Sequence, residues 1–367
     1  MEKIKERDVR RLTALFMLGS IIVIGGTAEN ASRSWLSLVL SLGIAVPLIL
    51  LWVWILSRFP EKDLSGIFEE LFGRTGKKFL SAAVGIYSFI TLSWTLGNYT
   101  SFITMLTTRN TEKQIPGMLV AAVATLIVCM GMKVLCGASG IFLGFLLCSL
   151  AVTLPLSILS LDFSAFPLPI FGNDMPGVFE GALSLGMMPF GEVIILLFVI
   201  PPVGKGDRGR GIVLGALVAF GVMLVVFLRN VMMLGERSMD CLYFHSFYAL
   251  RILGIGSFFQ RMEILVSVVY MCSDLLRVAV CILCCGKAVS GIFETDIKKT
   301  AFGPWAVMAF AASEMVLING QAVFVFREVC KYIALPFCVG IPLLCGIFLF
   351  FEKKRQIDGK FPLKFRG

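Results

Sequence analysis

Two apolar stretches of this chain contain residues that interrupt helices. The residues of interest are Gly19, Ser20, Gly25 and Gly26 in the first stretch, and Gly186, Pro189, Phe190, Gly191 and Glu192 in the second. Glycine is a poor helix former, and proline removes a backbone donor and clashes with the preceding turn. A broken helix exposes N–H groups that suit a carboxylate and carbonyl groups that suit an ammonium. Because an α-amino acid carries both groups, the two breaks together predict a binding site for such a molecule.

Each break taken alone also has a simpler interpretation. Several small residues allow helices to pack closely in a membrane, and a proline by itself produces a kink. Glu192, directly after the second break, has two open roles. As a carboxylate it would bind the exposed N–H groups of the helix segment that follows. As a titrating acid it would couple proton binding to a conformational change.

Polar side chains recur at helical spacing in two further apolar stretches. They are Tyr87, Thr91, Trp94, Asn98 and Ser101 in one, and Glu263, Ser267, Tyr270, Asp274, Arg277 and Cys281 in the other. Steps of three and four residues place each set on one helix face. We predict that Trp94 and Asn98 face inward, where they either contact a ligand or hydrogen-bond to neighbouring helices.

Asp274 and Arg277 are charged residues within an apolar stretch, so they must face the protein interior and find partners. At a spacing of three residues they can pair with each other, which gives a structural ion pair. The functional alternative is a fixed cation beside the substrate, or a proton-linked acid. We predict that Arg277 places a fixed positive charge near the first break.

The elements that position these residues are membrane-spanning helices. The chain of 367 residues is 57% hydrophobic and 16% charged, with a mean hydropathy of +0.89, which excludes an ordinary soluble domain and a disordered chain. Its apolar runs are about 18–25 residues long and lack the alternation of barrel strands. With boundaries good to about three residues, we predict ten spans, at 12–30, 35–56, 79–106, 117–132, 138–160, 177–200, 211–235, 259–286, 304–320 and 332–351.

Ten spans divide into two halves of five, and an odd-numbered repeat reverses its direction in the membrane. The two breaks then lie at matching positions, in the first span of each half, which points to a binding site at their interface. We therefore expect a single transmembrane domain with one repeat over about 12–160, a second over about 177–351, and tails at 1–11 and 352–367. The connection 236–258 is expected to contain a short interfacial helix.

The net charge of +9 reflects membrane topology, so no nucleic-acid partner is expected. Alternate loops and the two tails carry 23 Lys and Arg on one side and seven on the other, which predicts cytoplasmic termini. Arg229 is expected to extend to the interface. His245, in an outer loop, suggests no catalytic role. We see no cleavable signal peptide, no metal or cofactor motif, and no nucleophile–base pair of an enzyme.

The chain resembles the spore germination permease family of the GerAB type. The motifs that carry the resemblance are Gly19-Ser20 with Gly25-Gly26, Trp35-Leu36, Arg58-Phe59-Pro60, Pro189-Phe190-Gly191-Glu192-Val193 through Pro201, and Arg261-Met262-Glu263. Members belong to the amino acid–polyamine–organocation superfamily. The resemblance implies an all-α membrane protein with the LeuT-type inverted-repeat fold, in which spans 1 and 6 are broken and sodium is often bound near the break in span 1.

The resemblance also implies a function. The expected protein is the membrane subunit of a germinant receptor in the spore inner membrane, with a larger A subunit and a lipoprotein C subunit as partners. It would bind a small nutrient germinant, often an amino acid, at spans 1 and 6. The alternative is an amino acid permease, proton-coupled or uncoupled, because a sensor and a transporter need the same site.

Overall fold

The computed structural model describes residues 4–19, 21–27, 30–106, 114–158, 160–163, 175–204, 206–253, 261–295, 302–316 and 320–357. Over these residues the chain forms helices and connecting turns, and no strand. The helices in chain order are α1 (Glu6–Leu18), α2 (Ile21–Ile24), α3 (Ser34–Arg58), α4 (Leu64–Leu106), α5 (Gln114–Met130), α6 (Met132–Ile158), α7 (Met175–Leu185), the π-helical turn η2 (Gly186–Gly191), α8 (Val193–Val199), α9 (Asp207–Leu234), α10 (Glu236–Cys241), α11 (His245–Arg251), α12 (Glu263–Phe293), α13 (Gly303–Val316), α14 (Gly320–Leu335), the π-helical turn η4 (Pro336–Gly340) and α15 (Ile341–Ile357).

In each of the ten predicted spans, most of the described residues lie in helices. Seven helical segments in the described part of the chain are long and apolar enough to cross a membrane. The remaining spans correspond to the interrupted pair α1 and α2, to the 17-residue helix α5 and to the 14-residue helix α13. Length and composition therefore identify seven of the ten predicted spans as membrane-crossing segments.

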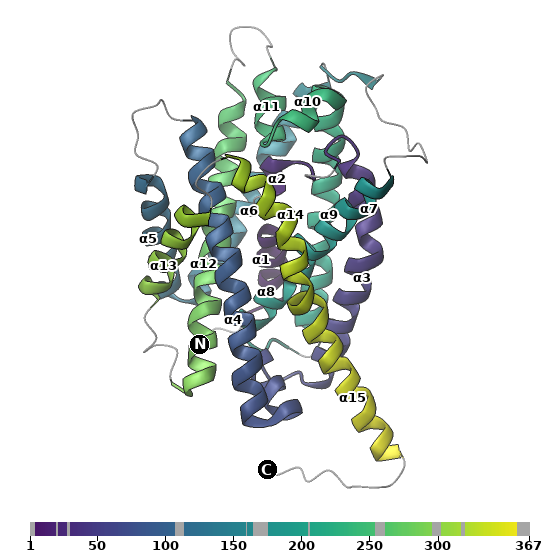
Figure 1. Ribbon diagram of the computed structural model, residues 1–367, viewed down its shortest axis with the longest axis vertical. Helices are drawn as coiled ribbons and strands as arrows, with labels where there is room; N and C mark the ends of the chain where they lie inside the picture. Colours follow the sequence, from purple (N-terminus) through teal and green to yellow (C-terminus); the bar gives the residue numbers. More distant parts are fainter. Residues whose placement is uncertain are drawn as a thin grey trace.

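The middle of the bundle is formed by α1, α2 and α8, which lie behind α14 in the view of Figure 1. Close approach of α1 to α9 depends on small residues, as is common in membrane helices. A Cβ atom on Gly211 would lie 2.9 Å from Cβ of Val9, and one on Gly215 would lie 2.6 Å from Cβ of Thr13. Glycine at these two positions thus lets α9 contact α1 directly, so that α9 covers α1.

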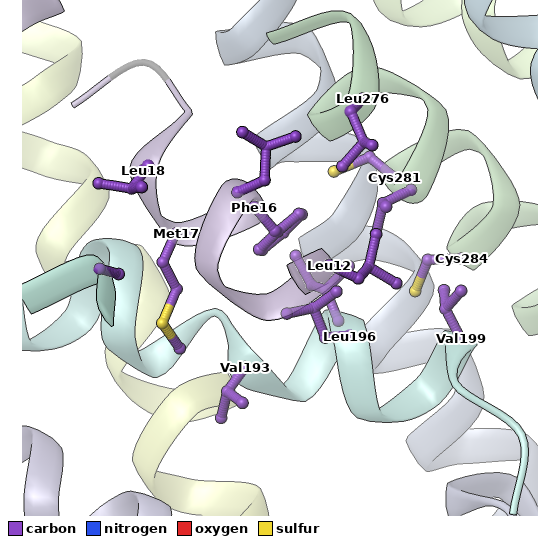
Figure 2. Packing of buried hydrophobic residues seen from close by; sticks show 14 of the residues in the cluster. Leu12, Phe16, Met17, Leu18, Val193, Leu196, Val199, Leu276, Cys281 and Cys284 are labelled. Carbon is purple, nitrogen blue, oxygen red and sulfur yellow. The ribbon is translucent and has the colours of Figure 1, made fainter. Parts of the chain in front are cut away.

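The inner half of the sixth span is the most enclosed part of the core. Every residue of α8 is buried. Figure 2 shows Leu12 and Phe16 of α1 close to Leu196 of α8 and Leu276 of α12, and all four side chains are buried. The apolar contacts among α1, α8 and α12 fix the helix that precedes the break in span 1 and the helix that follows the break in span 6.

Several local features differ from the sequence-based expectations. Helix α4 begins at Leu64, within a segment expected to be a connection, and passes through a non-helical residue, Gly73 (φ 71°). The connection 236–258 contains two short helices, α10 and α11. The expectation for Arg229 is wrong, because its side chain is 3% exposed and donates to Oδ1 of Asn230 from Nη2 at 2.8 Å. The adjacent amide gives the guanidinium a partner inside the bundle, so it does not need to extend to the interface.

Candidate substrate site at two broken helices

The first span is interrupted where the sequence predicted a break. Helix α1 ends at Leu18, Gly19 has a non-helical conformation (φ 8°, ψ −124°), and α2 starts at Ile21. Ser20, one of the predicted site residues, lies outside the described residues. Helix α2 has only four residues and is terminated by Gly25, whose φ of 65° suits glycine. The two halves of this span therefore leave main-chain groups outside a continuous helix.

The sixth span is interrupted as well. Helix α7 ends at Leu185 and is followed by the π-helical turn η2, in which Met188 has extended backbone angles (φ −132°, ψ 109°). Pro189 follows, and a regular helix resumes at Val193. Single π-helical turns within helices are frequent at functional sites. The two predicted breaks are thus confirmed as backbone features, and η2 packs against α1.

Arg277 of α12 connects the two interruptions. Its Nη2 atom donates to Oε2 of Glu192 at 2.6 Å, Nη1 donates to the carbonyl oxygen of Phe16 at 3.2 Å, and Nε donates to Oγ1 of Thr95 at 3.2 Å. A Cβ atom on Gly19 would lie 3.0 Å from Cδ of Arg277, so the break in span 1 leaves room for this side chain. The guanidinium is therefore a positive charge beside both interruptions.

Glu192 directs its carboxylate to Arg277, and its side chain is fully buried. The expectation that it would bind the N–H groups at the start of α8 is wrong, since no side-chain capping bond is formed there. A guanidinium offers a full positive charge and directional donors, whereas a helix N-terminus offers about half a charge. The Oε1 atom has no hydrogen-bond partner among the described residues.

The ion pair of Arg277 differs from the pair suggested by the sequence. Spacing along the chain favoured Asp274 as its partner, and the structure instead pairs Arg277 with Glu192 on another span. Asp274 is also fully buried, one helical turn away on α12. Spacing within one helix could not reveal Glu192 as a partner, because that contact depends on how spans 6 and 8 pack.

A small cavity of about 30 Å³ lies between the two breaks. A cavity of this size holds about one water molecule, so an amino acid would fit only after the surrounding side chains move. Its walls come from α2, α4, α7, η2 and α12. The lining residues are Ile21, Ile24, Trp94, Ser184, Leu185, Met188, Pro189 and Arg277.

Three of the predicted site residues, Trp94, Pro189 and Arg277, line this cavity. Sequence reasoning missed Ile21, Ile24, Ser184, Leu185 and Met188. The apolar members of that set have the residue types of an ordinary core. Their position next to the breaks was the one signal that could have distinguished them.

The glycines of the first break face protein groups. A Cβ atom on Gly25 would lie 2.3 Å from Nδ2 of Asn230, and one on Gly26 would lie 3.1 Å from Cε1 of His245. Neither glycine lines the cavity. Their small size is therefore required by the close contact of α2 with α9 and α11, rather than by the approach of a ligand.

The remaining residues of the second break also face protein groups. A Cβ atom on Gly186 would lie 3.1 Å from Cβ of Ile44, and one on Gly191 would lie 2.8 Å from Cβ of Cys338. Phe190 is 2% exposed and belongs to the apolar core. The contact of Gly191 with Cys338 brings η2 against η4, a second π-helical turn that also contains a proline and a glycine.

Asn98 lies on the inward face of α4, as predicted, and its side chain is fully buried. Its Oδ1 atom accepts a hydrogen bond of 2.8 Å from the hydroxyl of Tyr243, which belongs to the connection between α10 and α11. Asn98 thus ties span 3 to this outer connection, and it does not line the cavity.

Comparison with solved structures defines the class of protein. Mhp1, a nucleobase-cation-symport-1 family transporter in a closed conformation with bromovinylhydantoin bound, is similar with a TM-score of 0.60 and 12% identity, over 92% of this chain and 77% of that chain. MhsT in complex with L-phenylalanine is similar with a TM-score of 0.53 and 16% identity, over 96% of this chain and 99% of that chain. The fold is that of the LeuT-type transporters, as predicted, and the chain is an integral membrane protein.

A sequence profile of the spore germination protein family, the spore permeases, matches residues 3–320. The chain belongs to this family and is a permease-like membrane protein without an enzymatic role. A search of curated protein sequences gave no match.

Proposed function

We propose that this chain is the membrane subunit of a spore germinant receptor and binds a small nutrient germinant, an amino acid, in the cavity between the broken helices. The observation that carries the proposal is the cavity itself, which is bounded by Ile21 of α2, Pro189 of η2 and Arg277 of α12. A midplane site between two discontinuous helices is the usual arrangement in proteins of this architecture. Both similar structures contain a small organic ligand, bromovinylhydantoin in Mhp1 and L-phenylalanine in MhsT.

The chemistry of the cavity wall suits an amino acid. A guanidinium has five N–H donors, and the described hydrogen bonds of Arg277 use three of them. The other two are suited to a ligand carboxylate. Trp94, Leu185 and Met188 provide an apolar surface for a side chain. The charge of Arg277 is partly balanced by Glu192, so a zwitterion would not leave a large excess charge in the site.

Signalling follows from the small size of the cavity. Because an amino acid does not fit a space of about 30 Å³, ligand binding must favour a conformation in which the walls have moved apart. A ligand shifts such an equilibrium by its difference in affinity for the two conformations. We propose that this shift is passed to an A subunit and a lipoprotein C subunit in the spore inner membrane, the partners that the family resemblance implies.

The test compares two substitutions of the same type in the purified protein. Ile21→Phe adds bulk to the cavity wall, whereas Ile86→Phe adds it at a position that is 58% exposed on the outer surface of the bundle. We expect one or more of the twenty amino acids to bind the unmodified protein by isothermal titration calorimetry. Ile21→Phe should weaken that binding by about tenfold or more, as overpacking does, and Ile86→Phe should leave it unchanged. Equal affinities in the two variants would contradict the proposed site.

The runner-up function is an amino acid permease, which would use the same cavity. Uptake of the bound amino acid into liposomes that contain only this chain would favour the permease. Binding without uptake would favour the receptor subunit.

A further inference from the structure

The outer half of the broken first span ends in carbonyl groups that cannot accept hydrogen bonds from a following helical turn, because the helix stops there. Helix α2 stops at Ile24, and Gly25 turns the chain away with a φ of 65°. Buried carbonyl groups need hydrogen-bond donors. In this structure the donors come from side chains of α9 and α11, which hold the end of α2 from outside the helix.

Three side chains serve as these donors. Ser246 donates to the carbonyl oxygen of Ile22 at 2.6 Å, and Nδ2 of Asn230 is 3.5 Å from the carbonyl oxygen of Gly25. Nδ1 of His245 contacts the carbonyl oxygen of Ile24. The side chains of His245, Ser246 and Asn230 are all buried. The arrangement is therefore a built cap on α2 rather than a surface contact.

The second ring nitrogen of His245 also faces a carbonyl group. Nε2 lies 2.6 Å from the carbonyl oxygen of Met239 in α10. A carbonyl oxygen only accepts hydrogen bonds, and a neutral imidazole has one N–H donor and one lone pair. With two carbonyl partners, both ring nitrogens must carry a proton to form both bonds. The geometry thus fits an imidazolium. A neutral ring would instead place a lone pair against the oxygen of one of the two carbonyl groups.

The link to the candidate site passes through Ile24. This residue lines the cavity, and its carbonyl oxygen is the one that His245 contacts. We propose that His245 is an imidazolium that positions the outer half of span 1 over the site, so that loss of its proton loosens this wall. This inference rests on the proposed function, since a movement of this wall affects function only if the cavity binds a ligand. His245 is a positioning residue, because it acts through Ile24.

The direction of the pH effect follows from linkage. The proton binds more tightly when α2 is in place, because only then do both carbonyl groups accept from the ring. Low pH therefore favours the closed wall and high pH favours its release. The charged residues on α9, α10, α11 and α12 in the described part of the chain are Asp207, Arg208, Arg210 and Arg229 on α9, Glu236, Arg237 and Asp240 on α10, Arg251 on α11, and Glu263, Asp274, Arg277 and Lys287 on α12.

The protonation state can be measured directly, because His245 is the one histidine in the sequence. The protein is labelled with ¹⁵N-histidine, purified with a tag that lacks histidine, and placed in lipid for magic-angle-spinning NMR. At pH 7 both ring nitrogens should give the signals of protonated nitrogens. A signal from an unprotonated ring nitrogen at pH 7 would overturn the proposal.

Hydrogen exchange then tests the positioning role without any ligand. After correction for intrinsic rates, the amides of residues 21–25 should lose about tenfold protection between pH 6 and pH 9, as expected for the loss of a charge-assisted hydrogen bond. In His245→Gln this difference should disappear. Ser246→Ala is the matched control, since it removes a neighbouring bond to α2 that does not titrate, and it should lower protection equally at both pH values.

The amides of α8 serve as an internal reference, because that helix is buried and lies well below α11 in the view of Figure 1, so it should not respond. Protection of residues 21–25 that stays constant while the histidine loses its proton would overturn the proposal. So would an unchanged pH difference in His245→Gln. If that variant does not fold, the NMR measurement and the exchange of the unmodified protein still decide the outcome. Because no ligand is present, these results do not depend on whether the cavity binds an amino acid.

Discussion

The guanidinium of Arg277 lies 2.6 Å from the carboxylate of Glu192, and the same guanidinium donates to the main chain of Phe16. One side chain on span 8 is therefore bonded to the last turn before the break in span 1 and to the first residue after the break in span 6. This relationship gives the two interruptions a common anchor, and most of the predictions that follow concern it or the cavity beside it.

Removal of Arg277 should destabilise the protein strongly. Arg277→Ala leaves the carboxylate of Glu192 buried without its cation, and breaking such a buried pair costs about 3–5 kcal/mol. Asp274→Ala is the matched control, a change on the same helix face that leaves the pair intact. We expect thermal unfolding in detergent to show a much larger loss for Arg277→Ala. Equal losses in the two variants would show that the Arg277–Glu192 pair contributes no more to stability than Asp274 does.

Glu192→Gln separates the structural role of this residue from a titrating one. The amide keeps the size of the side chain and one acceptor for Arg277, and it removes the charge. If the role is structural, the variant should bind the amino acid more weakly in titration calorimetry, because Arg277 is less well held. The pH dependence of that binding should be the same as in the unmodified protein. Amino acid binding by the variant that no longer varies with pH would show that Glu192 titrates during the conformational change.

Ligand binding should not require sodium. The resemblance to LeuT-type proteins places a frequent sodium site near the break in span 1, and in this chain a fixed charge, Arg277, donates to the carbonyl oxygen of Phe16 at that break. Affinities measured by titration calorimetry in sodium chloride and in choline chloride should agree within about twofold, because a difference of that size is below 0.5 kcal/mol. Binding that is lost in choline chloride would contradict the assignment.

The outer cap of span 1 should be sensitive to a single methyl group. Gly25→Ala forces a positive φ on alanine and puts its Cβ 2.3 Å from Nδ2 of Asn230, so we expect a loss of more than about 1 kcal/mol. Gly221→Ala, within α9, is the control because no atom lies within 4 Å of its Cβ. That substitution should be neutral or stabilising in thermal unfolding. A tolerated Gly25→Ala would show that the cap is not tightly packed.

The sequence predicted the backbone of the site better than its walls. Glycine and proline reveal interruptions locally, so the breaks at Gly19 and Pro189 could be predicted without knowledge of the packing. The same logic could have identified η4, where Pro336 and Gly340 interrupt span 10. That segment was predicted only as part of the span 332–351.

Contacts between distant segments were beyond the sequence. The pairing of Glu192 with Arg277 depends on the packing of spans 6 and 8, and spacing along one helix pointed to Asp274 instead. His245 was set aside as a residue of an outer loop, yet it is 2% exposed and contacts α2. The apolar lining of the cavity could not be distinguished from core residues, because both consist of the same residue types.

The predicted topology has its own test. The excess of Lys and Arg on alternate loops and on the tails predicts that both termini face the cytoplasm. Epitope tags fused to either end should be protected from protease in intact cells and cleaved after permeabilisation. A C-terminal tag that is cleaved in intact cells would show that the predicted number of crossings is wrong.

The central claim is that a small ligand binds between the two broken helices, beside Arg277. The most direct measurement is a cryo-EM structure of the purified protein with the tightest-binding amino acid from the calorimetric survey. We predict density for the ligand bounded by Ile21, Trp94 and Pro189, with its carboxylate within hydrogen-bond distance of the guanidinium, in a cavity larger than the present volume of about 30 Å³. Ligand density at another place in the bundle, with this cavity unchanged, would contradict the account.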